Sequence, residues 1–150
     1  MKTIKEQLHR ECQRFLDDRL AAVVNRIENI QESLQSETKS SAGDKHETGR
    51  AMLQLEREKA GNQLKDIQVQ LETFSKVTID ENAGVIRLGS LVTTNQNIYF
   101  IAISVGEIVI DEITYFAISP SSPIGRMLLG KTVGDVFFFN GEEQKVLEIK

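Results

Sequence analysis

Residues 16–34 read LDDRLAAVVNRIENIQESL, and this stretch determines the architecture of the first half of the chain. Its large apolar residues recur at alternating spacings of four and three, at Leu16, Leu20, Val23, Ile27, Ile30 and Leu34. This is the heptad spacing of a helix that packs along another helix. With its flanking residues the stretch predicts a helix over about residues 4–36, roughly 50 Å long at about 1.5 Å per residue.

A second segment of the same chain carries the same alternation, at Leu53, Arg57, Ala60, Leu64, Ile67, Leu71 and Phe74. Placed antiparallel, Leu34 lies opposite Leu53 and Leu16 opposite Leu71, and the numbers in every apolar pair sum to 87. One register therefore satisfies the whole seam, which favours an intramolecular two-helix coiled coil. A coiled-coil dimer is the alternative, because heptads do not specify the partner.

The composition changes near residue 76, which predicts two domains. Residues 1–75 contain no proline, whereas residues 76–150 hold both prolines and seven of the ten glycines. We therefore expect an α+β protein, with a hairpin over 1–75, a linker over 76–84 and an antiparallel β domain over 85–150. Its predicted strands cover 85–92, 98–105, 108–110, 113–118, 136–139 and 146–149.

The β domain also carries a predicted short helix over residues 123–129. Ser122 is a good N-cap, Pro123 suits the first helical turn, and Gly130 can end the helix with a positive φ. We interpret these residues as a fold signature and assign them no chemistry.

Charge and cysteine content narrow the class of protein. The net charge of −4 and the lack of a long basic run argue against binding to bare duplex DNA. The single cysteine, Cys12, forms no internal disulfide, which fits a reducing compartment. The sequence shows no signal peptide and no stretch approaching a membrane span. We expect a cytoplasmic monomer without membrane contact.

The predicted tip of the hairpin carries two carboxylates three residues apart, Asp44 and Glu47, after Gly43. One interpretation is a capping box, in which Asp44 accepts a backbone N–H and Glu47 reaches back. The other is a partial Mg²⁺ site, because Mg²⁺ commonly takes one or two protein carboxylates and completes its shell with water and phosphate. His46 and His9 are expected to be solvated.

Basic residues surround this acidic pair: Lys39, Lys45, Arg50 and Arg57. Structural pairing within the hairpin is one role for the two arginines, with the stem of Arg57 lying along the seam. Contact between this basic set and RNA phosphates is the other.

Three aromatic residues follow one another at Phe137-Phe138-Phe139. Because strand side chains alternate between faces, at least one ring must leave the helix-covered face. A loop could bury it, or it could form an apolar contact for a protein partner, and Phe137 and Phe139 are the predicted contact residues.

Three motifs resemble the bacterial GreA/GreB transcript cleavage factors. Gly43-Asp44-x-x-Glu47 is similar to the acidic tip of that family. Residues 119–135, SPSSPIGRMLLGKTVGD, resemble its C-terminal signature, and Gly89-Ser90-x-Val92 resembles the first strand of its C-terminal domain. The resemblance covers nearly the full chain in the right order.

The resemblance implies a coiled coil joined to an FKBP-like domain, and RNA polymerase as the partner. In that family the coiled coil enters the polymerase's secondary channel. Asp44 and Glu47 would there help to hold Mg²⁺, shared with the polymerase and not held by the free protein, and promote cleavage of the 3′ end of a backtracked RNA. The protein would be an accessory factor, while the polymerase performs the hydrolysis.

This chain departs from the family pattern near the tip and in the signature. Thr48-Gly49-Arg50-Ala51 replaces the usual Asn-Ala-Glu-Tyr, Lys45 replaces a hydrophobic residue, and Met127 replaces a small one. A regulator that occupies the channel without promoting cleavage is therefore an alternative. A prolyl isomerase is a more remote one, for which the sequence shows no aromatic-lined pocket, and a coiled-coil adaptor is another.

Overall fold

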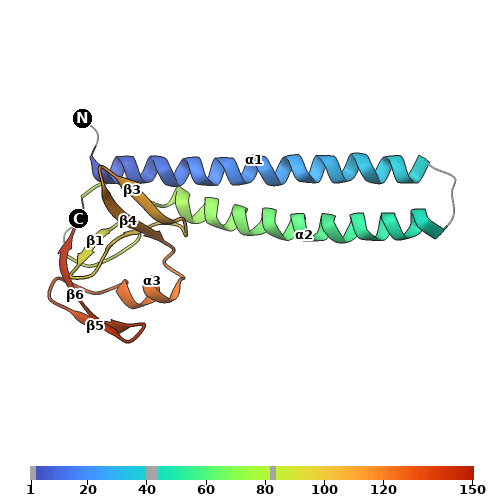
Figure 1. Cartoon of the computed structure of the whole chain (residues 1–150). Helices are drawn as coiled ribbons and strands as arrows, with labels where there is room; N and C mark the ends of the chain where they lie inside the picture. The colour runs from blue at the N-terminus through green and yellow to red at the C-terminus, as the bar shows by residue number, and fades with distance from the viewer. Residues whose placement is uncertain (1–2, 40–43, 82–83) are drawn as a thin grey trace. The chain divides into compact units, whose positions relative to one another are not determined.

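The computed structural model (Figure 1) describes residues 3–39, 44–81 and 84–150, with side chains described except at 37–39 and 44–47. It is an α+β protein with two long helices followed by a six-stranded sheet and a short helix. The chain forms two compact units. One is Leu16–Leu71, and the other combines Met1–Phe15 with Glu72–Lys150, so this division runs through both long helices.

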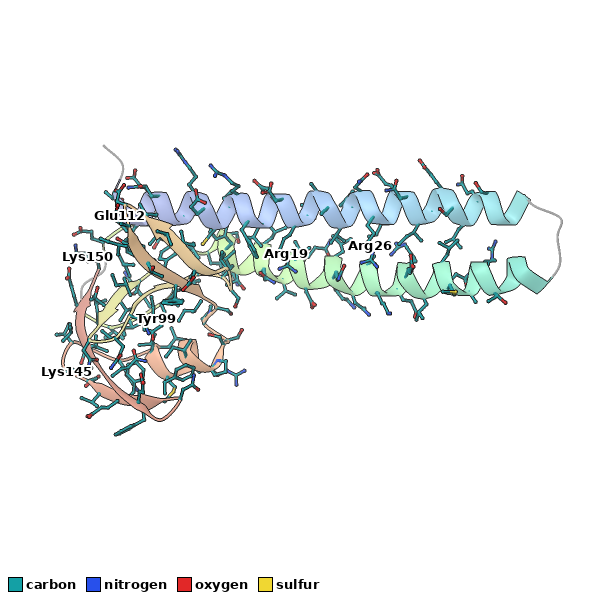
Figure 2. The ribbon with its side chains drawn as sticks, in the orientation of Figure 1. Arg19, Arg26, Tyr99, Glu112, Lys145 and Lys150 are labelled. Carbon is teal, nitrogen blue, oxygen red and sulfur yellow. The ribbon has the colours of Figure 1, made fainter. Side chains whose placement is uncertain are left out.

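The first unit is built from helix α1 (Ile4–Lys39) after residue 15 and from helix α2 (Asp44–Ser75) up to residue 71, and the two helices run side by side (Figure 1). The predicted seam is confirmed between Leu20 and Leu71, because five of its residues from each helix form a single cluster. The buried members are Val23, Ile27, Ile30, Ala60 and Ile67, and the partly buried ones are Leu20, Leu34, Leu53, Leu64 and Leu71. Across the rim, Arg26 Nη1 donates to Gln63 Oε1 at 3.2 Å (Figure 2).

The opening turns of α1 and the end of α2 belong to the second unit. Leu8 and Cys12 are fully buried there, and burial raises the pKa of the Cys12 thiol to about 12. His9 is half-buried and stacks on Phe74, with ring centroids 4.4 Å apart. The expectation that His9 is solvated was therefore wrong, because a facing aromatic ring covers it.

The sheet has the order β3-β4-β2-β1-β6-β5 and contains one parallel pair. Its strands are β1 (Leu91–Thr94), β2 (Ile98–Ile101), β3 (Gly106–Ile110), β4 (Ile113–Ile118), β5 (Val136–Phe139) and β6 (Glu142–Ile149). The prediction of a wholly antiparallel sheet was wrong, because β2 and β4 pair in parallel and the other neighbours pair antiparallel.

The first strand begins later than predicted, at Leu91 instead of residue 85. Gly89 adopts φ +91°, and a Cβ at this position would lie 2.5 Å from the Thr78 carbonyl oxygen. Gly89 thus lies in a tight turn whose backbone packs against the 76–81 segment. Ser90 is fully buried, and its Oγ accepts from the Arg87 N–H at 3.0 Å. The glycine and serine of this motif therefore act in the turn before the strand.

The segment over residues 76–81 packs against the sheet unit. Val77 is buried, and the Asp80 carbonyl accepts a hydrogen bond from Lys5 Nζ at 2.8 Å. Lys5 is itself only 5% exposed. The predicted linker is thus ordered by contacts at these positions.

Helix α3 (Pro123–Leu128) confirms the predicted cap. Ser122 Oγ accepts from the Gly125 N–H at 3.1 Å, and Gly130 adopts φ +85° after the helix. Ile124 and Leu128 enter the core of the sheet, and Met127 packs against it. The helix lies so close to the preceding turn that a Cβ at Gly125 would overlap the Ser119 carbonyl oxygen.

We expect Gly125→Ala to destabilise the protein by about 2 kcal/mol or more, because the methyl group has no space against a backbone oxygen. Gly61→Ala in α2 is the matched control. There the added methyl would meet only the Arg57 Nη1 atom at 3.0 Å, and alanine is favoured over glycine in helices by about 1 kcal/mol. Urea unfolding of both variants measures the difference. Equal effects of the two substitutions would contradict the close packing of α3.

The His9–Phe74 contact predicts a pH-dependent stability. Burial lowers the pKa of His9 below its ordinary value of 6.5, so the folded state binds fewer protons than the unfolded one in the window below 6.5. The free energy of unfolding should fall as the pH drops through that window. We expect His9→Phe to lose less stability than the wild type between about pH 7.5 and about pH 5.5. Urea midpoints at both pH values give the comparison, and parallel losses would exclude His9 as a source.

Candidate functional site

The acidic pair occupies the first turn of α2. The helix begins at Asp44, one residue earlier than a cap at Asp44 would place it, and Glu47 follows three residues later on the same helical face. The N-terminal end of a helix favours negative charge. The structure does not describe the side chains of five residues near this end of the helices: Lys39 at the end of α1, and Asp44, Lys45, His46 and Glu47 at the start of α2. Their hydrogen bonds and ligands stay predictions.

The predicted basic set is divided along α2. Arg50 is exposed and lies two turns from the start of the helix. Arg57 is thirteen residues from Asp44, about 20 Å along the axis. It is half-buried, and its Nη1 lies over Gly61, one turn further on. Arg57 thus follows the seam, as the structural interpretation predicted, and the tip set reduces to Lys39, Lys45 and Arg50.

Metal ligands do not cluster elsewhere in the part of the chain that the structure describes. Among those residues, no three His, Cys, Asp or Glu side chains come together as a potential metal site. The carboxylates of Asp44 and Glu47 are outside this set. Their placement in one helical turn fits the provision of one or two oxygen ligands to Mg²⁺, which needs further ligands from elsewhere.

The three phenylalanines of β5 alternate between faces as predicted, but the exposed ring is Phe138. Phe137 is buried in the core and Phe139 packs against it from a half-buried position. Phe138 is 64% exposed. The choice of Phe137 and Phe139 as contact residues assigned the wrong face to the strand, because the pattern alone did not say which face α3 covers.

A cavity of about 270 Å³ opens between α3 and the sheet. Its walls come from β2, β4, α3, β5, β6 and the β5–β6 turn, and Tyr99 faces the space between the sheet and α3 (Figure 2). The lining residues are Asn97, Tyr99, Phe116, Ile118, Ile124, Phe139, Asn140, Glu142 and Gln144. The expectation that the domain lacks an aromatic-lined pocket was wrong, because Tyr99, Phe116 and Phe139 line this cavity. The sequence did not reveal the pocket, since the three rings come from separate strands.

A buried polar network forms one end of this cavity. Gln144 is 3% exposed, and its Oε1 accepts from Tyr99 Oη at 3.0 Å and from Thr94 Oγ1 at 2.9 Å. Asn97 Nδ2 donates to Tyr99 Oη at 3.1 Å. The hydrogen bonds fix the Tyr99 ring against the sheet. The sequence analysis missed this network, because its last predicted strand begins at residue 146, whereas β6 begins at Glu142 and includes Gln144.

A second cavity, of about 350 Å³, lies on the opposite face of the sheet. Its charges balance, with Lys5 and Lys150 against Glu81 and Glu148, and Lys150 Nζ pairs with Glu148 Oε1 at 3.2 Å. Burial lowers the pKa of Lys5, whose ammonium group holds the Asp80 carbonyl. These contacts fasten the start of α1 to the 76–81 segment, which is a structural role.

No family model matches this chain, and no curated protein matches it significantly. The resemblance to the GreA/GreB factors therefore rests on the motifs and on the arrangement of their residues. None of the described helices combines the length and apolarity that crossing a membrane requires.

Proposed function

We propose that this protein is a transcription elongation factor that binds RNA polymerase through its secondary channel and stimulates Mg²⁺-dependent cleavage of backtracked RNA. The observation that carries the proposal is a helical hairpin with one continuous seam, whose second helix begins at an acidic pair. Within the hairpin unit, Asp44 lies 27 residues of helix from Leu71, which is about 40 Å. A narrow rod of that length can carry two carboxylates into a deep channel.

The sheet unit supports the same proposal. Its short helix has the Ser122 cap predicted from the sequence and the tightly packed Gly125, so the residues that carry the C-terminal resemblance form one ordered structural element. A mixed sheet with one short helix against its core is compatible with an FKBP-like domain. In this proposal the sheet unit docks on the polymerase while the hairpin enters the channel.

In the cleavage reaction Asp44 and Glu47 supply oxygen ligands that the polymerase lacks. Mg²⁺ bound by these carboxylates, polymerase groups and RNA oxygens would supply activation of the attacking water and stabilisation of the leaving oxygen. Lys39, Lys45 and Arg50 contact RNA phosphates near the acidic pair. Two carboxylates alone are too few for tight Mg²⁺ binding, so the free factor holds the ion weakly.

We expect Asp44→Asn and Glu47→Gln each to abolish stimulated cleavage in stalled, backtracked complexes, because each removes a negative charge from the ligand set. Folding should change by less than about 1 kcal/mol, since Asn caps helices as well as Asp does and Gln can replace Glu in a capping box. Polymerase binding should survive in both variants. Glu56→Gln, which removes an exposed carboxylate further along α2, is the matched control and should cleave normally.

Two outcomes would contradict this function. Cleavage by both variants at the wild-type rate would reduce the acidic pair to a helix cap. Wild-type protein that binds polymerase without stimulating cleavage would establish the alternative, a regulator that occupies the channel without promoting cleavage. The departures from the family pattern at Lys45 and Gly49 are the reason for this alternative.

The aromatic cavity between α3 and the sheet favours a second candidate function, prolyl isomerisation. Proline rings pack on aromatic side chains, and this cavity presents Tyr99, Phe116 and Phe139 around a space of about 270 Å³. An isomerase needs such a pocket to hold the peptide during rotation of the Xaa–Pro bond.

An assay on proline peptides tests this second function. If the cavity is an isomerase site, the wild type accelerates cis–trans exchange and Phe139→Ala loses most of that acceleration. Phe138→Ala is the matched control, since the neighbouring ring lies on the opposite face of β5 and should leave the rate unchanged. No acceleration by the wild type would eliminate isomerisation without affecting the transcription proposal.

A further inference from the structure

Strand β5 is one edge of the six-stranded sheet, and its outer face is apolar. Val136 and Phe138 are 46% and 64% exposed, while the rings on either side of Phe138 turn toward the core. The strand contains no charged residue and no proline. Such an edge can pair with another strand, because nothing along it prevents approach.

The backbone of this edge has free hydrogen-bonding groups at the same two residues. Asn140 and Gly141 both adopt positive φ, 53° and 79°, in a two-residue turn that places Phe139 opposite Glu142. In such a hairpin Phe139 and Phe137 exchange hydrogen bonds with β6. The N–H and C=O groups of Val136 and Phe138 therefore point away from β6, at the open edge.

The opposite edge of the sheet, β3, is protected differently. Its Ile110 and Ile113 flank another two-residue turn, so the outward-pointing backbone groups belong to Glu107 and Val109. Glu107 places an exposed charge on that edge, a common device against strand pairing. Of the two edges, β5 is the one without such a charge.

We propose that β5 is a self-association surface, on which a second copy of this chain pairs its own β5 antiparallel about a two-fold axis at Phe137. This axis places Val136 opposite Phe138 of the second copy, and Phe138 opposite Val136. Both residues have outward-pointing N–H and C=O groups, so each pair exchanges two hydrogen bonds. The outward-pointing N–H and C=O groups lie two residues apart, at Val136 and Phe138. A two-fold axis at the residue between them therefore brings each set of groups onto the same set in the second copy, so the edge is complementary to itself.

The side chains favour the same pairing. Phenylalanine opposite valine is a favourable cross-strand pair. On this face Phe138 lies beside Glu143 and Val136 beside Lys145, both on the neighbouring strand β6, and Lys145 is labelled in Figure 2. The paired edges would thus form an apolar centre with a charged residue at each end of every row, the usual arrangement of an interface core and rim.

The surface is small, which sets the expected strength of association. Four residues per strand give four intermolecular hydrogen bonds and four apolar side chains, well below the area of a stable interface. The protein is then a monomer at low concentration, as the sequence predicts, and a dimer at high concentration. Neither the hairpin tip nor the aromatic cavity takes part, so the inference does not depend on the proposed functions.

Sedimentation equilibrium over about 10 µM to about 1 mM tests the association. The weight-average mass of the wild type should rise from 16.9 kDa toward twofold higher. Phe138→Glu should remain monomeric, because it places a charge in the apolar centre. Val109→Glu is the matched control on the other edge, at a residue that is 63% exposed, and it should associate like the wild type.

Cysteine crosslinking tests the register. Residues in a hydrogen-bonded antiparallel pair have Cα atoms about 5.5 Å apart, within the range of a disulfide. A mixture of Val136→Cys and Phe138→Cys proteins should form a disulfide dimer that neither variant forms alone. Native Cys12 should stay out of the reaction, since it is fully buried and its thiol pKa is raised to about 12.

Three results would overturn the proposal. The first is a wild type that stays monomeric at the highest concentration, which leaves the edge for an extended segment of another protein. The second is association that Phe138→Glu does not weaken. The third is equal crosslinking of either cysteine variant alone, which would require a different register.

Discussion

The single register of the apolar seam is the constraint on which the hairpin depends. Shifting one helix along the other would move the isoleucines and leucines of α1 out of register with the apolar residues of α2, with which they form one cluster. The seam therefore fixes which turns of α2 lie beside which turns of α1. Because α2 begins at Asp44, nine residues before the seam residue Leu53, the same packing fixes where the first turn of α2 lies along the hairpin. The proposed chemistry is thus placed by apolar contacts that end several residues before it.

Periodic features of the sequence predicted the parts of the fold that depend on local contacts. The seam, strand β5 and the Ser122 cap follow from spacing and from individual residue preferences, and the structure confirms them. The parallel pairing of β2 with β4 did not follow, because strand direction depends on the path of the chain between them. The late start of β1 also escaped prediction, since it depends on the close approach of Gly89 to Thr78, which residue spacing within the strand does not encode.

The candidate sites divide in the same way. Asp44 and Glu47 were recognisable because two acidic residues at a helix start form a local pattern, whereas the aromatic cavity joins residues from distant parts of the chain. Tyr99 and Gln144 are 45 residues apart and meet through one buried hydrogen bond. The face of β5 was ambiguous for a related reason. Alternation gives two sets of side chains, and only the position of α3 decides which set is buried.

The cap and ligand interpretations of the acidic pair are compatible in physical terms. A carboxylate has two oxygens and about four acceptor positions, so one oxygen can accept a backbone N–H while the other remains available to a cation. A cap restricts the rotamers of the side chain, which lowers the entropy that later coordination must remove. The positive end of the helix also favours the negative charge of a carboxylate, although it weakens the attraction for the cation. A helix start therefore suits a carboxylate that must be ready for a metal without holding one, so that the ligands supplied by a partner determine when the ion binds.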